Sequence, residues 1–346
     1  MTEIDIRIDG CAGRITLQRP KALNALTYAM IPAISAALDG WATDDAVKLV
    51  LIDAEGDKAF CAGGDIADLY RTGTAGDFAF GQGFWHDEYR LNAKLAEYPK
   101  PIVSFMQGFT MGGGVGIGCH ASHRVVGAGS QIAMPECGIG LVPDVGGSML
   151  LARAPGHLGE YLGATCARMG PGDAIRAGFA DYFLPEDAWP ALKPLLCSTG
   201  TLDHLTAAVE PTPAARYDTF QAEIDQHFGH PNFAATLTSL RGSDSDFAAA
   251  TLKSLCRNSP LSMACAMEMA QCLRPNADIR AALSLEYRFT ARAMQHGDFL
   301  EGIRAAIIDK DRTPNWKHPL DDVPVADIKT MLAPLGDTDL RWKDTP

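Results

Sequence analysis

The stretch Thr110-Met111-Gly112-Gly113-Gly114-Val115-Gly116 follows the apolar run at positions 102–105 and opens a segment of small residues. A short apolar run predicts a buried strand, and a glycine turn that begins a helix leaves backbone N–H groups without partners. Glycine also lets the backbone approach a ligand closely. A second segment of this kind, AFCAGGD at positions 59–65, follows the apolar run at 49–52. The two segments could therefore each direct one N–H group at a single carbonyl oxygen, an arrangement that stabilises an oxyanion.

Patterns of strand, loop and helix recur through the chain as far as residue 190. Apolar residues alternate with polar ones at 4–8 and again at 15–17, which predicts an N-terminal hairpin. A helix is expected to begin at Asn24, whose side chain could cap it, although Pro32 should kink that helix or move its start. Helical periodicity also covers 85–97. This alternation predicts an α/β fold with helical crossovers.

The second half of the chain has a different character. From Thr201 onward helical periodicity dominates, and 214–305 is expected to be almost entirely helical. We therefore expect an α/β core at 1–200, which contains the chemically interesting residues, and a helical C-terminal region at 201–346.

Composition excludes several classes of partner. The chain has 346 residues, 47% of them hydrophobic and 21% charged, with a formal net charge of -12. Without a dense block of Lys and Arg, neither nucleic acid nor an anionic membrane surface is an expected partner. The N-terminus lacks the pattern of a signal peptide, and no apolar run is long enough to span a bilayer. The nine cysteines are scattered, without a C-x-x-C pair, so we expect a reducing, cytoplasmic location.

A third element contains two acids in an apolar setting. The stretch 133–147 reads AMPECGIGLVPDVGG and contains Glu136 and Asp144. Burial would raise the pKa of each carboxyl group and prepare it for acid–base chemistry. The alternative interpretation is that these are solvated loop acids or helix caps.

At this point the chain resembles the crotonase superfamily of enoyl-CoA hydratases and isomerases. AFCAGGDI and TMGGGVG resemble its two oxyanion-hole segments, and MPECGIGLVPDVGGS resembles its catalytic loop. The helix HDEYRLN at 86–92 and the stretch 284–316 make the 3-hydroxyisobutyryl-CoA hydrolase branch the closest match. The resemblance implies a crotonase-like spiral of ββα units, with the helical C-terminal region completing an acyl-CoA site.

The resemblance also implies roles for individual residues. Gly64 and Gly113 would donate backbone N–H groups, and Glu136 would be the catalytic carboxylate. Asp144 and Glu88 would line the acyl pocket, where Asp144 could bind or orient a 3-hydroxyl group and water. The role implied for Lys310, in the sequence IDKD, is contact with the CoA phosphates. No separate cofactor is expected, because CoA is part of the substrate. Relatives assemble as trimers or pairs of trimers, so a homo-oligomer is compatible with the resemblance.

One departure from the hydratases bears on the reaction. Those enzymes have a second glutamate at the position that Gly116 occupies in this chain. Addition of water to a double bond needs that carboxylate, whereas thioester hydrolysis needs one activating carboxylate and an oxyanion hole. We therefore expect hydrolysis of a short branched 3-hydroxyacyl-CoA, as in valine breakdown. The alternatives are an enoyl-CoA hydratase or isomerase with Asp144 as the second acid, and a non-catalytic CoA-binding protein.

Other motifs give weaker signals. Cys119 and His120 are neighbours on an expected helix, where adjacent side chains point about 100° apart, so Cys119 is expected to be a core thiol. Cys61 is expected to be a small packing residue. His120 and His123 lack further ligands at metal-binding spacing, so no metal site is predicted. Positions 112–118 read GGGVGIG, which fails the dinucleotide-binding pattern G-x-G-x-x-G.

Overall fold

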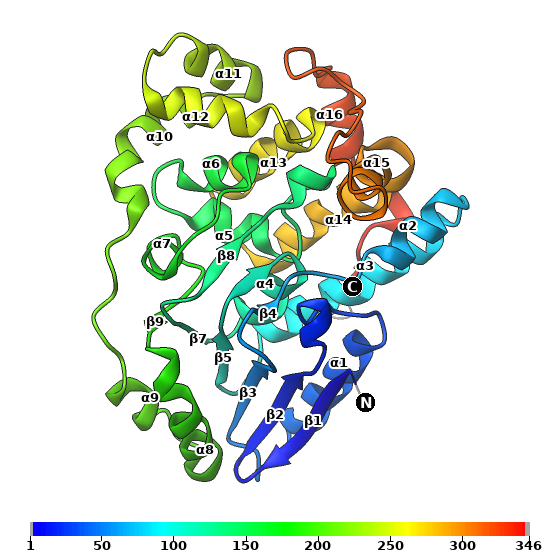
Figure 1. Ribbon diagram of the computed structural model, residues 1–346. Coiled ribbons are helices and arrows are strands. Elements are labelled where there is room, and N and C mark those ends of the chain that lie inside the picture. The colour runs from blue at the N-terminus through cyan, green and yellow to red at the C-terminus, as the bar shows by residue number, and fades with distance from the viewer. Residues whose placement is uncertain (1–2, 343–346) are drawn as a thin grey trace. The chain divides into compact units, whose positions relative to one another are not determined.

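The computed structural model describes residues 3–342 (Figure 1). Contacts between Cα atoms divide the chain into two compact units, each assembled from three separate segments. Unit 1 consists of Met1–Asp65, Arg90–Ala133 and Arg168–Arg216, and unit 2 consists of Ile66–Tyr89, Met134–Ala167 and Tyr217–Pro346. None of the described helices is both long and apolar enough to cross a membrane.

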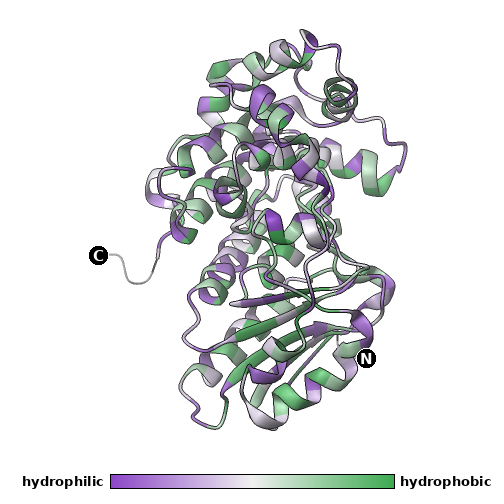
Figure 2. Cartoon of the chain, turned by 90° about the vertical axis from the view of Figure 1, so that its left-hand side faces the viewer, coloured by the Kyte–Doolittle hydropathy of each residue, from purple (hydrophilic) through white to green (hydrophobic). Residues whose placement is uncertain are grey.

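Unit 1 is built on a six-stranded sheet. Its strand order is β1-β2-β3-β5-β7-β9. The strands are β1 (Ile4–Asp9), β2 (Ala12–Leu17), β3 (Leu49–Ala54), β5 (Ile102–Met106), β7 (His123–Val126) and β9 (Tyr182–Phe183). β1 and β2 form an antiparallel hairpin, and every other pair is parallel. The predicted hairpin and buried strands are therefore confirmed, and the strands of this sheet are largely hydrophobic in Figure 2.

A second, three-stranded sheet in unit 1 positions both glycine segments. Its parallel strands are β4 (Ala59–Cys61), β6 (Phe109–Met111) and β8 (Gln131–Ala133). The short helix α4 (Gly113–Gly118) follows β6. The first three residues of the segment 59–65 thus pair as a strand, and its glycines follow that strand. Because β4 and β6 are parallel neighbours, the two glycine segments leave the sheet at the same edge.

Helices cover both faces of the larger sheet. Trp41, near the end of α1 (Met30–Ala42), lies against Gly13, where a Cβ atom would be 2.3 Å from the indole ring. The other face packs on α8 (Trp189–Thr199) through a cluster that includes Ala12, next to Gly13 in the same strand. Successive residues of a strand point to opposite faces, so α1 and α8 enclose the sheet between them. The remaining helices of unit 1 are α7 (Pro171–Arg176) and α9 (Asp203–Ala207).

The expectation that Asn24 caps a helix is wrong. α1 begins at Met30, so Pro32 falls in its first turn, where proline is tolerated. Asn24 instead has left-handed backbone geometry with φ 55°. Its side-chain amide donates to the carbonyl oxygens of Glu55 and Ala59, at 2.9 and 2.8 Å. Asparagine favours both caps and left-handed turns, which is why the sequence alone gave the wrong role.

Unit 2 is helical apart from its loops. α13 is buried along most of its length and packs against α5, α6, α11, α14 and α16. The helices of unit 2 alternate hydrophobic and hydrophilic stretches in Figure 2, as expected of helices with one buried face. The helices are α2 (Ala67–Thr74), α3 (Phe78–Ala96, in this unit as far as Tyr89), α5 (Gly147–Arg153), α6 (Leu158–Thr165), α10 (Gln221–Phe228), α11 (Phe233–Arg241), α12 (Asp246–Leu255), α13 (Pro260–Leu273), α14 (Ile279–His296), α15 (Phe299–Ile303) and α16 (Val325–Leu332).

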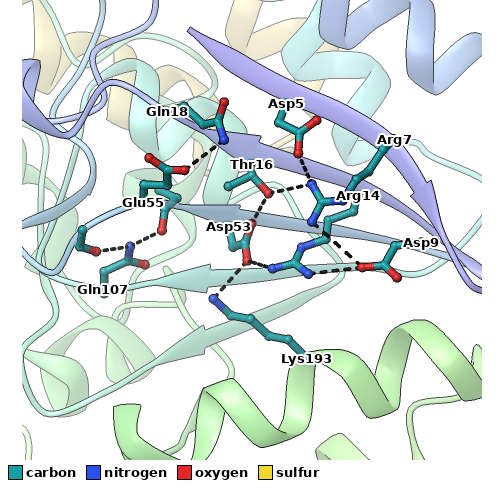
Figure 3. A network of polar contacts seen from close by, with 12 residues as sticks. Asp5, Arg7, Asp9, Arg14, Thr16, Gln18, Asp53, Glu55, Gln107 and Lys193 are labelled. Atoms are coloured by element: carbon teal, nitrogen blue, oxygen red, sulfur yellow. Dashed lines mark hydrogen bonds and ion pairs between the residues drawn. The ribbon is translucent and has the colours of Figure 1, made fainter. Parts of the chain in front are cut away.

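A buried carboxylate ties the hairpin of unit 1 to α8. Asp53, at the end of β3, accepts hydrogen bonds from Arg14 at 2.8 Å and Thr16 at 2.7 Å and pairs with Lys193 of α8 at 3.1 Å (Figure 3). Burial alone would raise the pKa of Asp53, but Lys193 and Arg14 outweigh it and hold that pKa below its ordinary value. One side chain thus stabilises β2, β3 and α8 together.

We expect Asp53→Asn to lower the free energy of unfolding at pH 7 by about 3 kcal/mol, because it leaves Arg14 and Lys193 without their buried partner. Urea unfolding measures the change, with the exposed Asp57→Asn as a control that stays within about 0.5 kcal/mol of wild type. Since the folded pKa of Asp53 is lowered, the difference should disappear as pH falls through that pKa. An Asp53→Asn protein as stable as wild type at pH 7 would contradict this role.

Candidate active site

The two glycine segments meet in unit 1, as the sequence predicted. A Cβ atom on Gly114 would lie 2.1 Å from the carbonyl oxygen of Cys61, so only glycine allows the start of α4 to approach β4 this closely. Gly63 has φ 120° and Gly112 has φ 49°, both in the region that favours glycine. Close backbone contact therefore explains why position 114 is glycine, and positive φ angles explain the glycines at 63 and 112.

The segment around Gly64 is held by its neighbours without use of its own N–H group. The Leu26 N–H donates to the Gly63 carbonyl at 2.9 Å, and the Asp65 N–H donates to the Leu26 carbonyl at 2.7 Å. Within residues 3–342, no backbone hydrogen bond of this segment involves the Gly64 N–H. Gly113 is the first residue of α4, a position whose N–H has no acceptor within a helix. Both groups are thus suited to bind an external oxygen, and their role as oxyanion donors stays a prediction.

Four of the buried carboxyl groups of unit 2 form a cluster, because three of them interact electrostatically with the fourth, Asp144. The side chains are Glu88 on α3, Glu136 in the 3₁₀ turn η2 (Glu136–Ile139), Asp144 in the loop that follows, and Glu286 on α14. None is more than 4% exposed. Within residues 3–342, no Lys or Arg forms an ion pair with any of them. The interpretation of Glu136 and Asp144 as solvated loop acids is therefore wrong.

Burial shifts the pKa of all four groups in the same direction. Burial and the nearby Asp144 charge raise the pKa of Glu136 and that of Glu88 well above the ordinary range. Burial raises the pKa of Asp144 to about 7, although a hydrogen bond from Tyr89 opposes the shift. For Glu286, burial raises the pKa to about 8. Perturbed carboxyl groups of this kind mark functional sites, because acid–base chemistry requires pKa values near the working pH.

The carboxyl groups differ in their hydrogen bonds. Tyr89 donates its hydroxyl to Asp144 Oδ2 at 2.8 Å, and its own oxygen lies 3.4 Å from the Thr290 hydroxyl. In contrast, Glu136 Oε2 and Glu88 Oε1 are buried and have no hydrogen-bond partner within residues 3–342. A buried polar atom without a partner is costly, so these two oxygens are suited to accept from a ligand. Asp144 is thus fixed in place, whereas Glu136 and Glu88 each retain a free oxygen.

Lys310 differs from the buried carboxyl groups in its surroundings. It is exposed, has left-handed backbone geometry with φ 58°, and follows the π-helical turn η5 (Arg304–Ile308). The acids on either side of it, Asp309 and Asp311, each pair with Arg304 at 2.7 Å. Arg304, which also pairs with Glu301 at 2.8 Å, thus binds both of these acids, while Lys310 itself forms no ion pair within residues 3–342. Its contact with CoA phosphates stays a prediction.

Sequence reasoning missed two residues that organise the carboxyl cluster. Tyr89 and Glu286 lie inside the stretches HDEYRLN and SLEYRF that supported the family resemblance, but neither was assigned a role. Their roles depend on Asp144 and its loop, 55 and about 140 residues away in the chain. The sequence of these two stretches indicated the family, but it did not indicate that Tyr89 and Glu286 contact Asp144 and its loop.

Cys119 and Cys61 both lie in the core. Cys119 is buried, and burial raises the pKa of its thiol to about 12. Its sulfur lies 3.7 Å from Met106 Sδ. A thiol with a raised pKa in an apolar environment is a poor nucleophile, so the expectation of a core thiol is confirmed. Cys61, fully buried in β4, is likewise part of the core.

Comparison with known proteins identifies the family. A family model described as enoyl-CoA hydratase/isomerase matches residues 12–332. The chain belongs to this family and is a crotonase-type enzyme with the predicted α/β crotonase fold.

Individual relatives have names that refer to different reactions. The 3-hydroxyisobutyryl-CoA hydrolase, mitochondrial, of Rattus norvegicus is 37% identical, covering 98% of this chain and 91% of the relative. A solved structure named an enoyl-CoA hydratase from Rhodobacter sphaeroides 2.4.1 is 57% identical with a TM-score of 0.95, covering 99% of this chain and all of the other. A carnitinyl-CoA dehydratase from Mycobacterium thermoresistibile is 36% identical with a TM-score of 0.94 over the full length of both chains.

The buried carboxyl groups give the protein a characteristic pH dependence. A carboxyl group whose pKa is raised on folding binds its proton more tightly in the folded state, so stability falls as pH rises from the unfolded pKa to the folded one. With Asp144 at about 7 and Glu286 at about 8, we expect the free energy of unfolding to decline between about pH 4 and pH 8. Glu88→Gln, which removes one such group, should gain stability relative to wild type at pH 8 but not at pH 4. Urea unfolding across this range tests the prediction, and a difference independent of pH would contradict it.

Proposed function

We propose that the chain hydrolyses the thioester of a short, branched 3-hydroxyacyl-CoA, with 3-hydroxyisobutyryl-CoA as the specific substrate. The observation that supports this most directly is Glu136, a buried carboxyl group with an unpartnered oxygen and a raised pKa. The curated relatives at 33 to 38% identity have names that specify this hydrolysis. Such a reaction would belong to valine breakdown.

In the proposed reaction Glu136 acts on the thioester carbonyl carbon. As a nucleophile, its carboxylate would add to that carbon and expel CoA thiolate, and water would then cleave the mixed anhydride and restore Glu136. As a general base, it would instead take a proton from water as the water adds to the carbonyl, after which the C–S bond breaks. In both routes the carbonyl oxygen becomes an oxyanion that the N–H groups of Gly64 and Gly113 would stabilise.

The remaining carboxyl groups suit the acyl part of such a substrate. A 3-hydroxyl group is a hydrogen-bond donor, and Glu88 offers a buried oxygen without a partner. Asp144, held by Tyr89, has further acceptor capacity on its carboxylate. We propose that these two groups select substrates with a 3-hydroxyl group, and that Lys310 contacts the CoA phosphates.

We expect Glu136→Gln to reduce release of free CoA thiol at least a hundredfold, because the amide is neither a nucleophile nor a base. A thiol-reactive dye measures the rate with 3-hydroxyisobutyryl-CoA. Glu268→Gln, at an exposed position of α13, is the matched control and should retain wild-type turnover. Near-normal turnover of Glu136→Gln would remove Glu136 from the mechanism.

A second function has one specific observation in its favour, namely the hydratase name of the solved structure at 57% identity. A panel of CoA esters distinguishes the two reactions. We expect thiol release from esters with a 3-hydroxyl group, and no loss of the enoyl chromophore when an enoyl-CoA is supplied. Consumption of that chromophore without thiol release would instead support hydration, and binding without turnover of any ester would indicate a non-catalytic CoA-binding protein.

A further inference from the structure

Glu286 is a fully buried carboxyl group to which the proposed mechanism gives no task. It lies on α14 with 0% exposure, and its oxygens accept from the backbone of the loop that contains Asp144. The Gly146 N–H donates to Oε2 at 2.8 Å, and the Ser148 N–H donates to Oε1 at 3.1 Å. The Ser148 hydroxyl also donates to Oε1. Three donors from residues just after Asp144 thus bind the single carboxyl group of Glu286.

The loop that Glu286 holds has strained backbone geometry. Val145 has φ 53° and Gly146 has φ 79°. A β-branched residue in the left-handed region is a true outlier, and strain of this kind persists only where surrounding contacts enforce it. The Gly147 N–H closes the turn on the Asp144 carbonyl at 2.7 Å. Glu286 adds contacts that hold this geometry, because it accepts from Gly146 and Ser148, the residues on both sides of Gly147.

The same helix supports the Asp144 side chain by a second route. Thr290 lies four residues after Glu286 on α14, so both side chains project from one face of the helix. The Thr290 hydroxyl is 3.4 Å from the Tyr89 hydroxyl, which donates to Asp144 Oδ2. α14 thus contacts the backbone after Asp144 directly, and reaches its carboxylate through Tyr89.

We propose that Glu286 is a positioning residue: it fixes the turn 145–148 so that Asp144 meets the 3-hydroxyl group of the substrate. This rests on the proposed function, in which Asp144 selects hydroxylated acyl groups. The position requires a carboxyl group because two backbone N–H groups each need an oxygen. Glutamine has one side-chain oxygen, so in Glu286→Gln either the Gly146 or the Ser148 N–H must face the amide NH₂ group.

The surroundings of Glu286 are consistent with this role. Burial raises its pKa, the hydrogen bonds from Ser148 and Gly146 lower it, and the charge of Asp144 raises it further. The Glu286 charge in turn contributes to the raised pKa values of Glu136 and Tyr89. No cation offsets these interactions within residues 3–342, so an acid here is justified by the loop contacts and not by an ion pair.

The test compares two substrates that differ only in the 3-hydroxyl group. For Glu286→Gln we expect kcat/KM for the hydroxylated CoA ester to fall at least tenfold, and that for the ester without the hydroxyl group to fall less than threefold. Ser148→Ala is the matched control: it removes the hydroxyl donor but retains both backbone donors, so both values should stay within threefold of wild type. An equal loss for the two substrates would reduce Glu286 to a structural role and overturn the proposal.

Amide hydrogen exchange gives a reading that does not depend on activity. We expect the Gly146 and Ser148 amides to be protected in the wild type and to exchange at least tenfold faster in Glu286→Gln. Should that variant fail to fold, unprotected amides at these two positions in the wild type would still overturn the proposal. A wild type that cleaves no CoA thioester would refute the proposed function and, with it, the selection by Asp144. Amides that are protected in the wild type and exchange faster in Glu286→Gln would then still establish that Glu286 fixes the turn.

Discussion

The carboxyl cluster around Asp144, which has no pairing cation within residues 3–342, is the constraint on which the chemistry of unit 2 depends. Burial of an ionised carboxylate is costly, and the usual remedy in this protein is visible at Asp53, where Arg14 and Lys193 hold the charge and lower the pKa. The cluster around Asp144 has no such remedy, so its pKa values rise instead. One fold thus contains a structural carboxyl group whose pKa is lowered by its cations and a cluster whose pKa values are raised by burial.

Such a cluster requires a rigid frame, because its energetics depend on fixed distances. Asp144 receives a hydrogen bond from Tyr89 on α3, and the backbone after it donates to Glu286 on α14. The left-handed Val145 shows that these contacts overcome local backbone preference. In unit 1 the same rigidity comes from close packing, since Gly114 lies against the Cys61 carbonyl and no side chain can intervene. Backbone geometry and contacts with neighbouring elements therefore position both the carboxyl cluster of unit 2 and the glycine segments of unit 1.

The parts that sequence reasoning predicted correctly are those with local signals. Residues adjacent in the sequence are enough to predict the hairpin, the buried strands, the glycine turns and the acids of 133–147. Asn24 was assigned the wrong role because caps and left-handed turns favour the same residue. Glu286 and Tyr89 were missed since their partners are distant in the chain, and only the folded structure places a carboxyl group beneath Gly146 and Ser148. The sequence also does not indicate that residues 66–89 and 134–167 form one compact unit with residues 217–346.

The hydrogen bond between Tyr89 and Asp144 also bears on the choice between hydrolysis and hydration. With glycine at position 116, a hydratase mechanism would need another acid beside Glu136, and the sequence suggested Asp144 for that role. That acid must hold a proton to donate, yet the Tyr89 hydroxyl donates to Asp144 and lowers its pKa relative to burial alone. Burial nevertheless keeps that pKa raised to about 7, so Asp144 has one oxygen fixed as the acceptor of the Tyr89 hydroxyl and a second that can accept from a substrate hydroxyl group or carry a proton. Glu136 differs from Asp144 because its Oε2 has no hydrogen-bond partner within residues 3–342, and this free oxygen is the feature on which the proposed hydrolysis depends.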